Sequence, residues 1–296
     1  MNYTGEIAAL CTAIFWTITA LAFERASLKV GSLSVNIIRL FLGFAFLSIF
    51  SWIYRGKLLP LDASADNWSW LLLSGMVGFV FGDLFLFKSY TIIGSRFAML
   101  IMTLVPPITA ITGWLLLDEK LRWLSILGMF LTVGGISVAI FSRNTKNGKL
   151  TLKLSAKGIL FAFGGALGQA IGLVLSKFGM KDYDPFAATQ IRLIAGMFGF
   201  VVLVSAIGRW GSIGQALKSK QAMIGTSIGS FFGPFLGVSF SLLAVKYTQT
   251  GVASTIMAIV PVLIIPPAIL IYKQKVTALE VIGAVVSISG VSLFFI

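Results

Sequence analysis

The sequence predicts an all-α integral membrane protein with ten transmembrane helices, arranged as two inverted five-helix repeats around a central cavity. Three observations predict this fold. The 296 residues are 57% hydrophobic and only 11% charged, a composition typical of a polytopic membrane protein. The apolar residues fall into stretches long enough to cross a bilayer. Short motifs also recur in the same order in the two halves of the chain.

A membrane-spanning helix needs about 20 predominantly apolar residues. The expected spans are 6–23, 33–53, 68–89, 94–117, 121–141, 156–176, 186–206, 222–244, 249–271 and 276–295. The connections between them are short, and the longest run over 55–67, 142–155 and 208–221. None is large enough to form a soluble domain, so the chain is expected to be one membrane domain.

The two halves of the chain, residues 1–150 and 151–296, are expected to be related repeats. Ile38-Arg39-Leu40 reappears as Ile191-Arg192-Leu193, and Val105-Pro106 reappears as Val260-Pro261. Five spans in each half is an odd number, so the two halves must cross the bilayer in opposite directions. Inverted repeats of this kind are typical of secondary transporters, whose substrate site lies where the repeats meet.

Two of the expected spans contain prolines at corresponding places. Pro106 and Pro107 lie within the fourth span, and Pro261 lies within the ninth. Proline lacks a backbone donor and clashes with the carbonyl four residues earlier, so Pro106 and Pro107 free the carbonyls of Met102 and Thr103. Interrupted helices in corresponding spans of two halves indicate a transporter's substrate site. The alternative is that the prolines only bend helices and shape the bundle.

Residues at suitable depths in the spans are predicted to line the central cavity, with ordinary helix packing as the alternative for each. They are Trp16, Phe79, Met99, Met102, Thr103, Gln169, Ser230, Ser254 and Met257. Methionine and aromatic side chains give an adaptable apolar surface. The freed carbonyls near Met102 and Thr103 could accept hydrogen bonds from an ammonium group, while Gln169 and the hydroxyls could hold a carboxylate.

Asp83 is the only carboxylate well inside an expected span, and a charge in that position indicates a functional site by default. Arg39 lies at a similar depth, so we expect the two to form an ion pair, with Lys88 or Arg96 as alternative partners for Asp83. The pair could close one end of the bundle or couple transport to protons. Because Arg39 and Arg192 recur in opposite orientations, they favour fold closure or snorkelling over contact with one substrate.

Several classes of protein are excluded or disfavoured. The chain has no histidine, and Cys11 is its only cysteine. We therefore expect no catalytic residue, no metal site, no cofactor and no intrachain disulfide, and the protein is not expected to be an enzyme. The formal charge of +13 comes from basic residues scattered between apolar spans, so no nucleic acid partner is expected. Their distribution slightly favours both termini outside the cell.

These features resemble the drug/metabolite transporter (DMT) superfamily, in particular the EamA family and its YddG-like amino-acid exporters. Trp16, the two arginines of the repeated motif, the proline-bearing spans and the glycine-rich fifth and tenth spans carry the resemblance. Asp118-Glu119-Lys120-Leu121 is similar to the acidic turn that closes the fourth span in that family. In the second half this turn is replaced by Lys273-Gln274-Lys275.

The resemblance implies an exporter of amino acids or similar small amphipathic metabolites in the bacterial inner membrane, working by alternating access. A drug or lipid flippase of the same superfamily is the alternative. Its partners would be a small-molecule substrate and the lipid bilayer. The glycine-rich fifth and tenth spans could form a homodimer face or could pack within one chain.

Overall fold

The computed structural model describes residues 3–143, 155–263, 266–267 and 277–295, and every regular element among them is a helix. Six helical stretches are long and apolar enough to cross a membrane: Thr4–Ser27, Ser32–Arg55, Ala65–Leu86, Ala156–Met180, Pro185–Ala206 and Lys220–Tyr247. Shorter apolar helices accompany them: Val105–Leu117, Trp123–Val138 and Val281–Ser292. The predicted all-helical membrane protein is therefore confirmed.

The long helices begin and end where the local sequence favours it. Only Gly31, with φ 83°, separates α1 (Thr4–Val30) from α2 (Ser32–Arg55), and Gly56, with φ 67°, ends α2. Glycine adopts such left-handed conformations at little cost. On the other half of the chain, α7 spans Ala156–Met180.

The helix α8 (Pro185–Ala206) follows α7 after a short turn. Its first residue is a proline, and the side chain of Asp184 accepts a hydrogen bond from the backbone amide of Ala187 at 2.9 Å. Both features favour the start of a helix.

The third and eighth expected spans are each divided into three helical pieces, with a wider π-helical segment in the middle. In the first half these are α3 (Ala65–Gly75), η1 (Met76–Gly82) and α4 (Asp83–Met102). In the second half they are α10 (Lys220–Ser230), η2 (Phe231–Gly237) and α11 (Val238–Tyr247). π-Helical segments are rare and occur often at functional sites, so these two segments mark places of interest.

The proline motifs coincide with breaks between helices. The helix α4 ends at Met102, and Pro106 and Pro107 lie in the first turn of α5 (Val105–Leu117), where their missing amide donors are not needed. In the second half, α12 (Thr250–Met257) is separated in the same way from α13 (Val260–Leu263), whose second residue is Pro261. The side chain of Pro261 lies outside the described residues.

One predicted boundary is wrong, and one predicted connection contains an additional helix. Residues 90–93 were expected to connect the third and fourth spans, but α4 continues through them as a helix, because a lone glycine at position 94 does not terminate one. The connection over 208–221 contains the helix α9 (Trp210–Lys218), which the pattern of spans did not indicate. Ile213 and Ala216 on α9 are buried, so packing against the bundle explains this helix.

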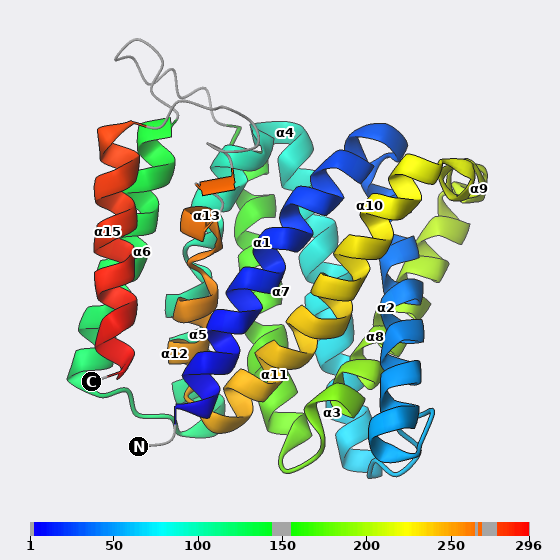
Figure 1. Cartoon of the computed structure of the whole chain (residues 1–296), viewed down its shortest axis with the longest axis horizontal. Coiled ribbons are helices and arrows are strands. Elements are labelled where there is room, and N and C mark those ends of the chain that lie inside the picture. The colour runs from blue at the N-terminus through cyan, green and yellow to red at the C-terminus, as the bar shows by residue number, and fades with distance from the viewer. Residues whose placement is uncertain (1–2, 144–154, 264–265, 268–276, 296) are drawn as a thin grey trace.

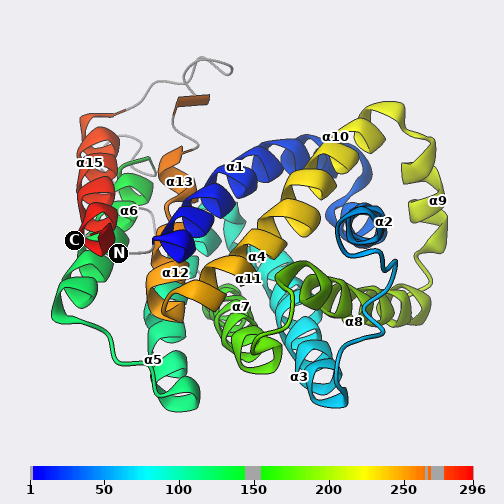
Figure 2. The same cartoon turned by 60° about the horizontal axis from the view of Figure 1, so that its bottom comes forward.

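The helices α6 (Trp123–Arg143) and α15 (Ala278–Ser292), the latter followed by η3 (Leu293–Phe295), stand together at one edge of the molecule (Figures 1 and 2). Small residues allow their close approach. A Cβ atom on Gly128 would lie 2.8 Å from the carbonyl oxygen of Gly290, and one on Gly135 would lie 2.6 Å from that of Gly283. At the opposite edge of the molecule lies α9 (Figure 1).

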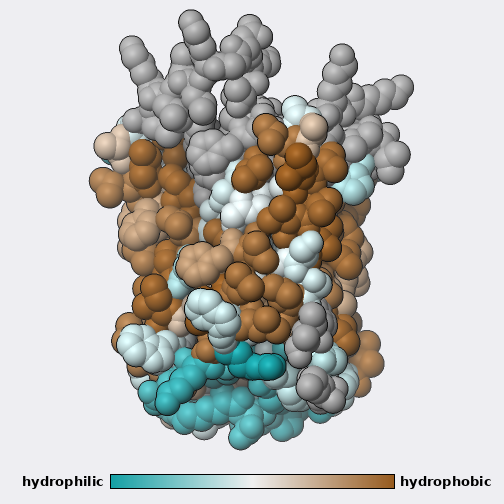
Figure 3. All heavy atoms as spheres, turned by 90° about the vertical axis from the view of Figure 1, so that its left-hand side faces the viewer, coloured by the Kyte–Doolittle hydropathy of each residue, from teal (hydrophilic) through white to brown (hydrophobic). Residues whose placement is uncertain are grey.

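The outer surface over α6 and α15 is suited to lipid. Figure 3 shows apolar side chains over most of the height of this face, with hydrophilic residues gathered at its lower rim. Large apolar side chains such as Phe130, Val285 and Ile282 are more than half exposed there. A broad apolar surface bordered by polar residues is expected for a protein that contacts the bilayer.

Candidate functional site: a buried arginine–aspartate centre

Asp83 lies at the junction of η1 and α4 and is only 5% exposed. The neighbouring helix α7 approaches this junction closely because both helices carry glycine there. A Cβ atom on Gly168 would lie 2.6 Å from the Cα of Gly82, and one on Gly172 would lie 2.9 Å from the Cα of Gly78. The glycines therefore bring α7 against η1 and seal the carboxylate of Asp83 inside the bundle.

Arg39 of α2 forms an ion pair and a hydrogen bond with Asp83 through its Nη2 atom. Its guanidinium carbon also lies 5.6 Å from the ring centroid of Phe23, within the range of a cation–π contact. The structure thus contains the ion pair that the sequence predicted from matching depths. Of the alternative partners, Lys88 is exposed, and the side chain of Arg96 lies outside the described residues.

Arg192 of α8 is only 6% exposed, and its Nη2 atom lies 3.2 Å from the position that a Cβ on Gly78 of η1 would take. Its guanidinium carbon lies 5.0 Å from the ring centroid of Phe79, which belongs to the same π-helical segment. The two copies of the Ile-Arg-Leu motif therefore place Arg39 in an ion pair with Asp83 and Arg192 against the π-helical segment that leads into Asp83. The sequence favoured fold closure or snorkelling for Arg192, and its burial is inconsistent with snorkelling to the surface. We call Arg39, Asp83 and Arg192 the arginine–aspartate centre.

The charges of this centre are not balanced. The centre contains two guanidinium groups and one carboxylate, and the Nε atoms of both arginines are buried without a hydrogen-bond acceptor among the described residues. A cation–π contact offsets only about 0.5–2 kcal/mol, whereas burying an unpaired ion costs several kcal/mol. The fold therefore retains a buried positive charge for which packing alone gives no reason.

Two of the predicted cavity residues lie at this centre. The aromatic ring of Phe79 contacts the guanidinium of Arg192, and the half-buried Gln169 follows the glycine of α7 that touches η1. A Cβ atom on Gly82 would lie 3.4 Å from the backbone nitrogen of Gln169. Phe79 therefore contacts Arg192, and the backbone of Gln169 lies against Gly82, the residue that precedes Asp83.

The remaining predicted cavity residues lie elsewhere. Trp16 packs on η2, where a Cβ atom on Gly237 would lie 2.6 Å from its indole ring. Ser230 and Ser254 are buried, and each donates a hydrogen bond to a carbonyl of its own helix, at 2.6 Å and 3.1 Å. Met257 is 2% exposed and belongs to the largest hydrophobic cluster.

The last three predicted cavity residues lie beside the helix break after α4. Met102 is half-buried against a small apolar cluster that includes Leu86 and Ala162, and Thr103 is 7% exposed. The side chain of Met99 lies outside the described residues. A role of these residues in contacting substrate stays a prediction.

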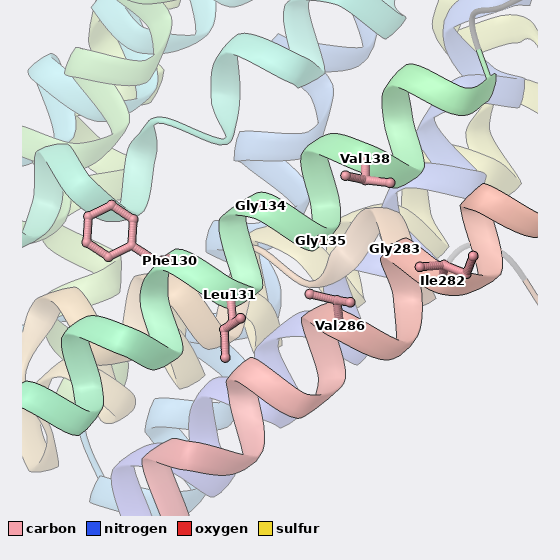
Figure 4. A pocket seen from close by; sticks show the side chains of 8 residues that line it. All are labelled: Phe130, Leu131, Gly134, Gly135, Val138, Ile282, Gly283 and Val286. Atoms are coloured by element: carbon pink, nitrogen blue, oxygen red, sulfur yellow. The ribbon is translucent and has the colours of Figure 1, made fainter.

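A cavity of about 140 Å³ lies between α6 and α15. Both helices contribute to its lining, which consists of Phe130, Leu131, Gly134, Gly135, Val138, Ile282, Gly283 and Val286 (Figure 4). None of the predicted cavity residues is among them. The lining offers apolar groups alone and belongs to the edge that faces lipid, so it does not suit a polar substrate.

A second polar cluster lies at the face where α1 begins. Glu119 accepts hydrogen bonds from Lys177 Nζ at 2.7 Å and from the backbone amide and hydroxyl of Thr250 at 2.8 and 2.7 Å. Lys177 also donates to the carbonyl of Thr248 at 2.8 Å, and the Thr248 hydroxyl donates to Glu6 at 2.6 Å. This Glu119 network ties together α1, α7, the end of α5 and the turn between α11 and α12.

The acidic turn noted in the sequence explains how Glu119 reaches this position. Asp118 adopts a left-handed conformation with φ 52°, which reverses the chain at the end of α5. The backbone amide of Glu119 then donates to the carbonyl of Gly113 at 3.3 Å. The sequence could not identify the partners of Glu119, because Lys177 and Thr250 are brought to it only by the fold.

The connection between α2 and α3 is bound to the turn before α8 on the same face. Asp62 forms ion pairs with Arg55 at 2.6 Å and Lys57 at 3.2 Å, and it accepts a hydrogen bond from the Tyr183 hydroxyl at 3.0 Å. Desolvation raises the pKa of Asp62, but the hydrogen bonds from Lys57 and Tyr183 outweigh it and the pKa is lowered. Burial raises the pKa of Tyr183 to about 12. We call these four residues the Asp62 cluster.

Comparison with known proteins identifies the class of molecule to which this site belongs. The model of the EamA-like transporter family matches residues 3–141 and again residues 156–296. The chain belongs to the EamA-like transporter family. It is therefore a multi-pass membrane transporter of the DMT superfamily that acts on a small molecule, and its relatives are transporters rather than enzymes.

Individual relatives of this EamA-like transporter are distant. It is 27% identical to the uncharacterized transporter YyaM of Bacillus subtilis (strain 168), over 74% of this chain and 70% of that protein. It is 24% identical to the uncharacterized transporter sll0355 of Synechocystis sp., over 69% of this chain and 74% of that protein. One solved crystal structure superposes with a TM-score of 0.77 at 15% identity, covering 99% of this chain and 97% of the other, and supports the fold alone.

Proposed function

We propose that this EamA-like transporter exports amino acids or similar small amphipathic metabolites across the bacterial inner membrane by alternating access. The observation that carries the proposal is the buried arginine–aspartate centre. Ionisable residues within transmembrane segments are rare, and they mark substrate or ion pathways. Here Arg39, Asp83 and Arg192 come from three different spans, and the guanidinium of Arg192 lies against the aromatic ring of Phe79. Charged and aromatic groups together suit a substrate that is charged at one end and apolar at the other.

The transporter is proposed to have ten spans in two inverted repeats. The family model matches the chain twice, and the π-helical segments η1 and η2 begin 155 residues apart, at Met76 and Phe231. The helices after the two breaks also begin 155 residues apart, at Val105 and Val260. The start of α1 and the end of α15 lie on the same face in Figure 1, which fits an even number of spans. Correspondence of irregular elements supports a duplicated five-span unit.

Alternating access would require the bundle to open on each side in turn. On the face where α1 begins, the Glu119 network and the Asp62 cluster connect helices from both halves of the chain, which supports a conformation closed on that side. The helix breaks after α4 and α12 and the π-helical segments lie in the third, fourth, eighth and ninth expected spans. We propose that these spans rock around the arginine–aspartate centre when the Glu119 network separates.

Counterflow in proteoliposomes tests this function. Vesicles loaded with an unlabelled mixture of the proteinogenic amino acids should accumulate the same mixture, labelled with ¹⁴C, from the outside. Vesicles without the transporter should not. Transfer of a fluorescent phospholipid between leaflets, measured on the same vesicles, should be absent. Lipid transfer without amino-acid counterflow would instead establish a flippase and overturn the proposal.

A further inference from the structure

The arginine–aspartate centre carries a formal charge of +1 within the part of the chain that the structure describes. Arg39 and Arg192 are both buried or nearly so, and Asp83 is the carboxylate that pairs with Arg39. The hydrogen bond to Asp83 comes from Arg39. Asp83 is therefore occupied by Arg39, and Arg192 forms no ion pair with a carboxylate of the described residues.

Arg192 has few compensating contacts of its own. The guanidinium of Arg192 contacts the ring of Phe79 and donates no hydrogen bond to a described residue. Its Nε atom is buried without an acceptor. Its Nη2 atom lies 3.2 Å from the position that a Cβ on Gly78 would take, so the guanidinium lies against the backbone of η1. A buried guanidinium without an acceptor is stabilised when an anion binds it.

We propose that Arg192 binds the carboxylate of the transported substrate. This inference rests on the proposed export of amino acids and deepens it by assigning the residue that holds the acidic end. A guanidinium is planar and can donate two parallel hydrogen bonds to the two oxygens of a carboxylate, which gives both orientation and affinity. Phe79 lies beside the same guanidinium and offers apolar surface to the rest of the substrate.

The proposal makes stability and binding respond in opposite ways. Replacing Arg192 with glutamine leaves Arg39 and Asp83 as a neutral pair, so the empty protein should unfold at the same temperature as the wild type or higher. The same replacement removes the donors that would hold a carboxylate, so binding should be lost. A residue that only supports the fold would show the reverse, because its removal would lower the unfolding temperature.

Competition in the counterflow assay tests the assignment. The probes are the labelled amino-acid mixture and, as competitors, the unlabelled amino acids and their carboxamides, which lack the negative charge. In the wild type the amides should compete at least tenfold less well than the acids. Arg192→Gln should lower counterflow at least tenfold and abolish the preference for acids over amides. Arg192→Lys should keep that preference, with weaker competition by the acids. The exposed control Arg209→Gln should behave as the wild type.

The outcomes separate this assignment from the proposed function. Retention of the acid preference by Arg192→Gln, or unfolding of both Arg192 variants, overturns the carboxylate site while amino-acid export stands. If the wild type shows no amino-acid counterflow, the proposed export function is overturned. The carboxylate site is then tested by comparing the unfolding temperature with isovalerate, a carboxylate, and with isovaleramide, its uncharged amide. Stabilisation of the wild type by isovalerate alone, absent in Arg192→Gln, supports the site; equal responses of the two proteins overturn it.

Discussion

Removing the charge of Glu119 should open the face at which α1 begins. In Glu119→Gln the amide oxygen can still accept hydrogen bonds from Thr250. The amide NH₂ group then faces the ammonium of Lys177, and because both groups are donors they form no hydrogen bond. The lost contact is a 2.7 Å hydrogen bond between charged groups whose side chains are 10% and 24% exposed. A hydrogen bond to a charged group contributes about 1.5–3 kcal/mol, so we expect the closed state to lose about 2 kcal/mol.

A loss of about 2 kcal/mol shifts the equilibrium between closed and open states about 30-fold. The shift can be measured as the reactivity of a cysteine at Thr109, a fully buried position on α5 one turn inside Gly113, in a Cys11→Ser background. A charged thiol reagent added from that side should modify Thr109→Cys about 30-fold faster when Glu119 is also replaced.

Asp66 provides the matched control for this experiment. It forms an ion pair with Lys181 on the same face, at 2.5 Å, but both side chains are about half exposed or more and are screened by solvent. Asp66→Asn should leave the reactivity of the cysteine unchanged. Equal reactivity in the Glu119→Gln protein and its parent would refute the assignment of the Glu119 network as a closure.

Three further predictions concern stability. Asp83→Asn leaves two buried arginines without a carboxylate and should destabilise the fold by about 3–5 kcal/mol, seen as loss of monodisperse protein on size-exclusion chromatography. If the variant instead folds and transports without pH dependence, Asp83 couples transport to protons. Gly135→Ala should lower the melting temperature, because the added Cβ would lie 2.5 Å from a hydroxyl and 2.6 Å from a carbonyl oxygen of α15. The control Gly134→Ala has nothing within 4 Å of the added Cβ and should raise the melting temperature slightly, because alanine favours a helix more than glycine does. Tyr183 should ionise near pH 12 rather than 10, measured as the difference in phenolate absorbance between the wild type and Tyr183→Phe. Its contribution to stability is therefore complete below pH 10 and is lost as the pH rises toward 12. Asp62, whose pKa is lowered, should stabilise the fold above its ordinary pKa of 3.8 and lose that contribution as the pH falls further.

Composition and periodicity were sufficient for the helical membrane fold, because a span must satisfy its own backbone and needs a long apolar stretch to do so. The prolines at 106 and 107 likewise located a helix break, since proline has one unambiguous effect on a backbone. The position of α9 and the helical course of α4 through residues 90–93 were missed. Both depend on packing against other helices, which local sequence does not encode.

The candidate site was predictable in part. The ion pair of Arg39 with Asp83 followed from their depths in neighbouring spans, since both charges need a partner in the bilayer. The position of Arg192 against η1 was not predicted, because it depends on the crossing of α8 with η1, where glycine allows contact with the backbone. For the same reason the acidic turn could be recognised in the sequence, but not its contact with Lys177.

The central claim is that two related halves cross the bilayer in opposite directions and enclose the arginine–aspartate centre. It is tested most directly by the sidedness of two corresponding connections, in single-cysteine proteins made from Cys11→Ser. Lys57 lies between α2 and α3, Arg209 lies between α8 and α9, and both are exposed. A membrane-impermeant maleimide applied to sealed vesicles of one orientation should label Lys57→Cys or Arg209→Cys but not both. Labelling of both from the same side would show that the halves run in the same direction and would contradict the account.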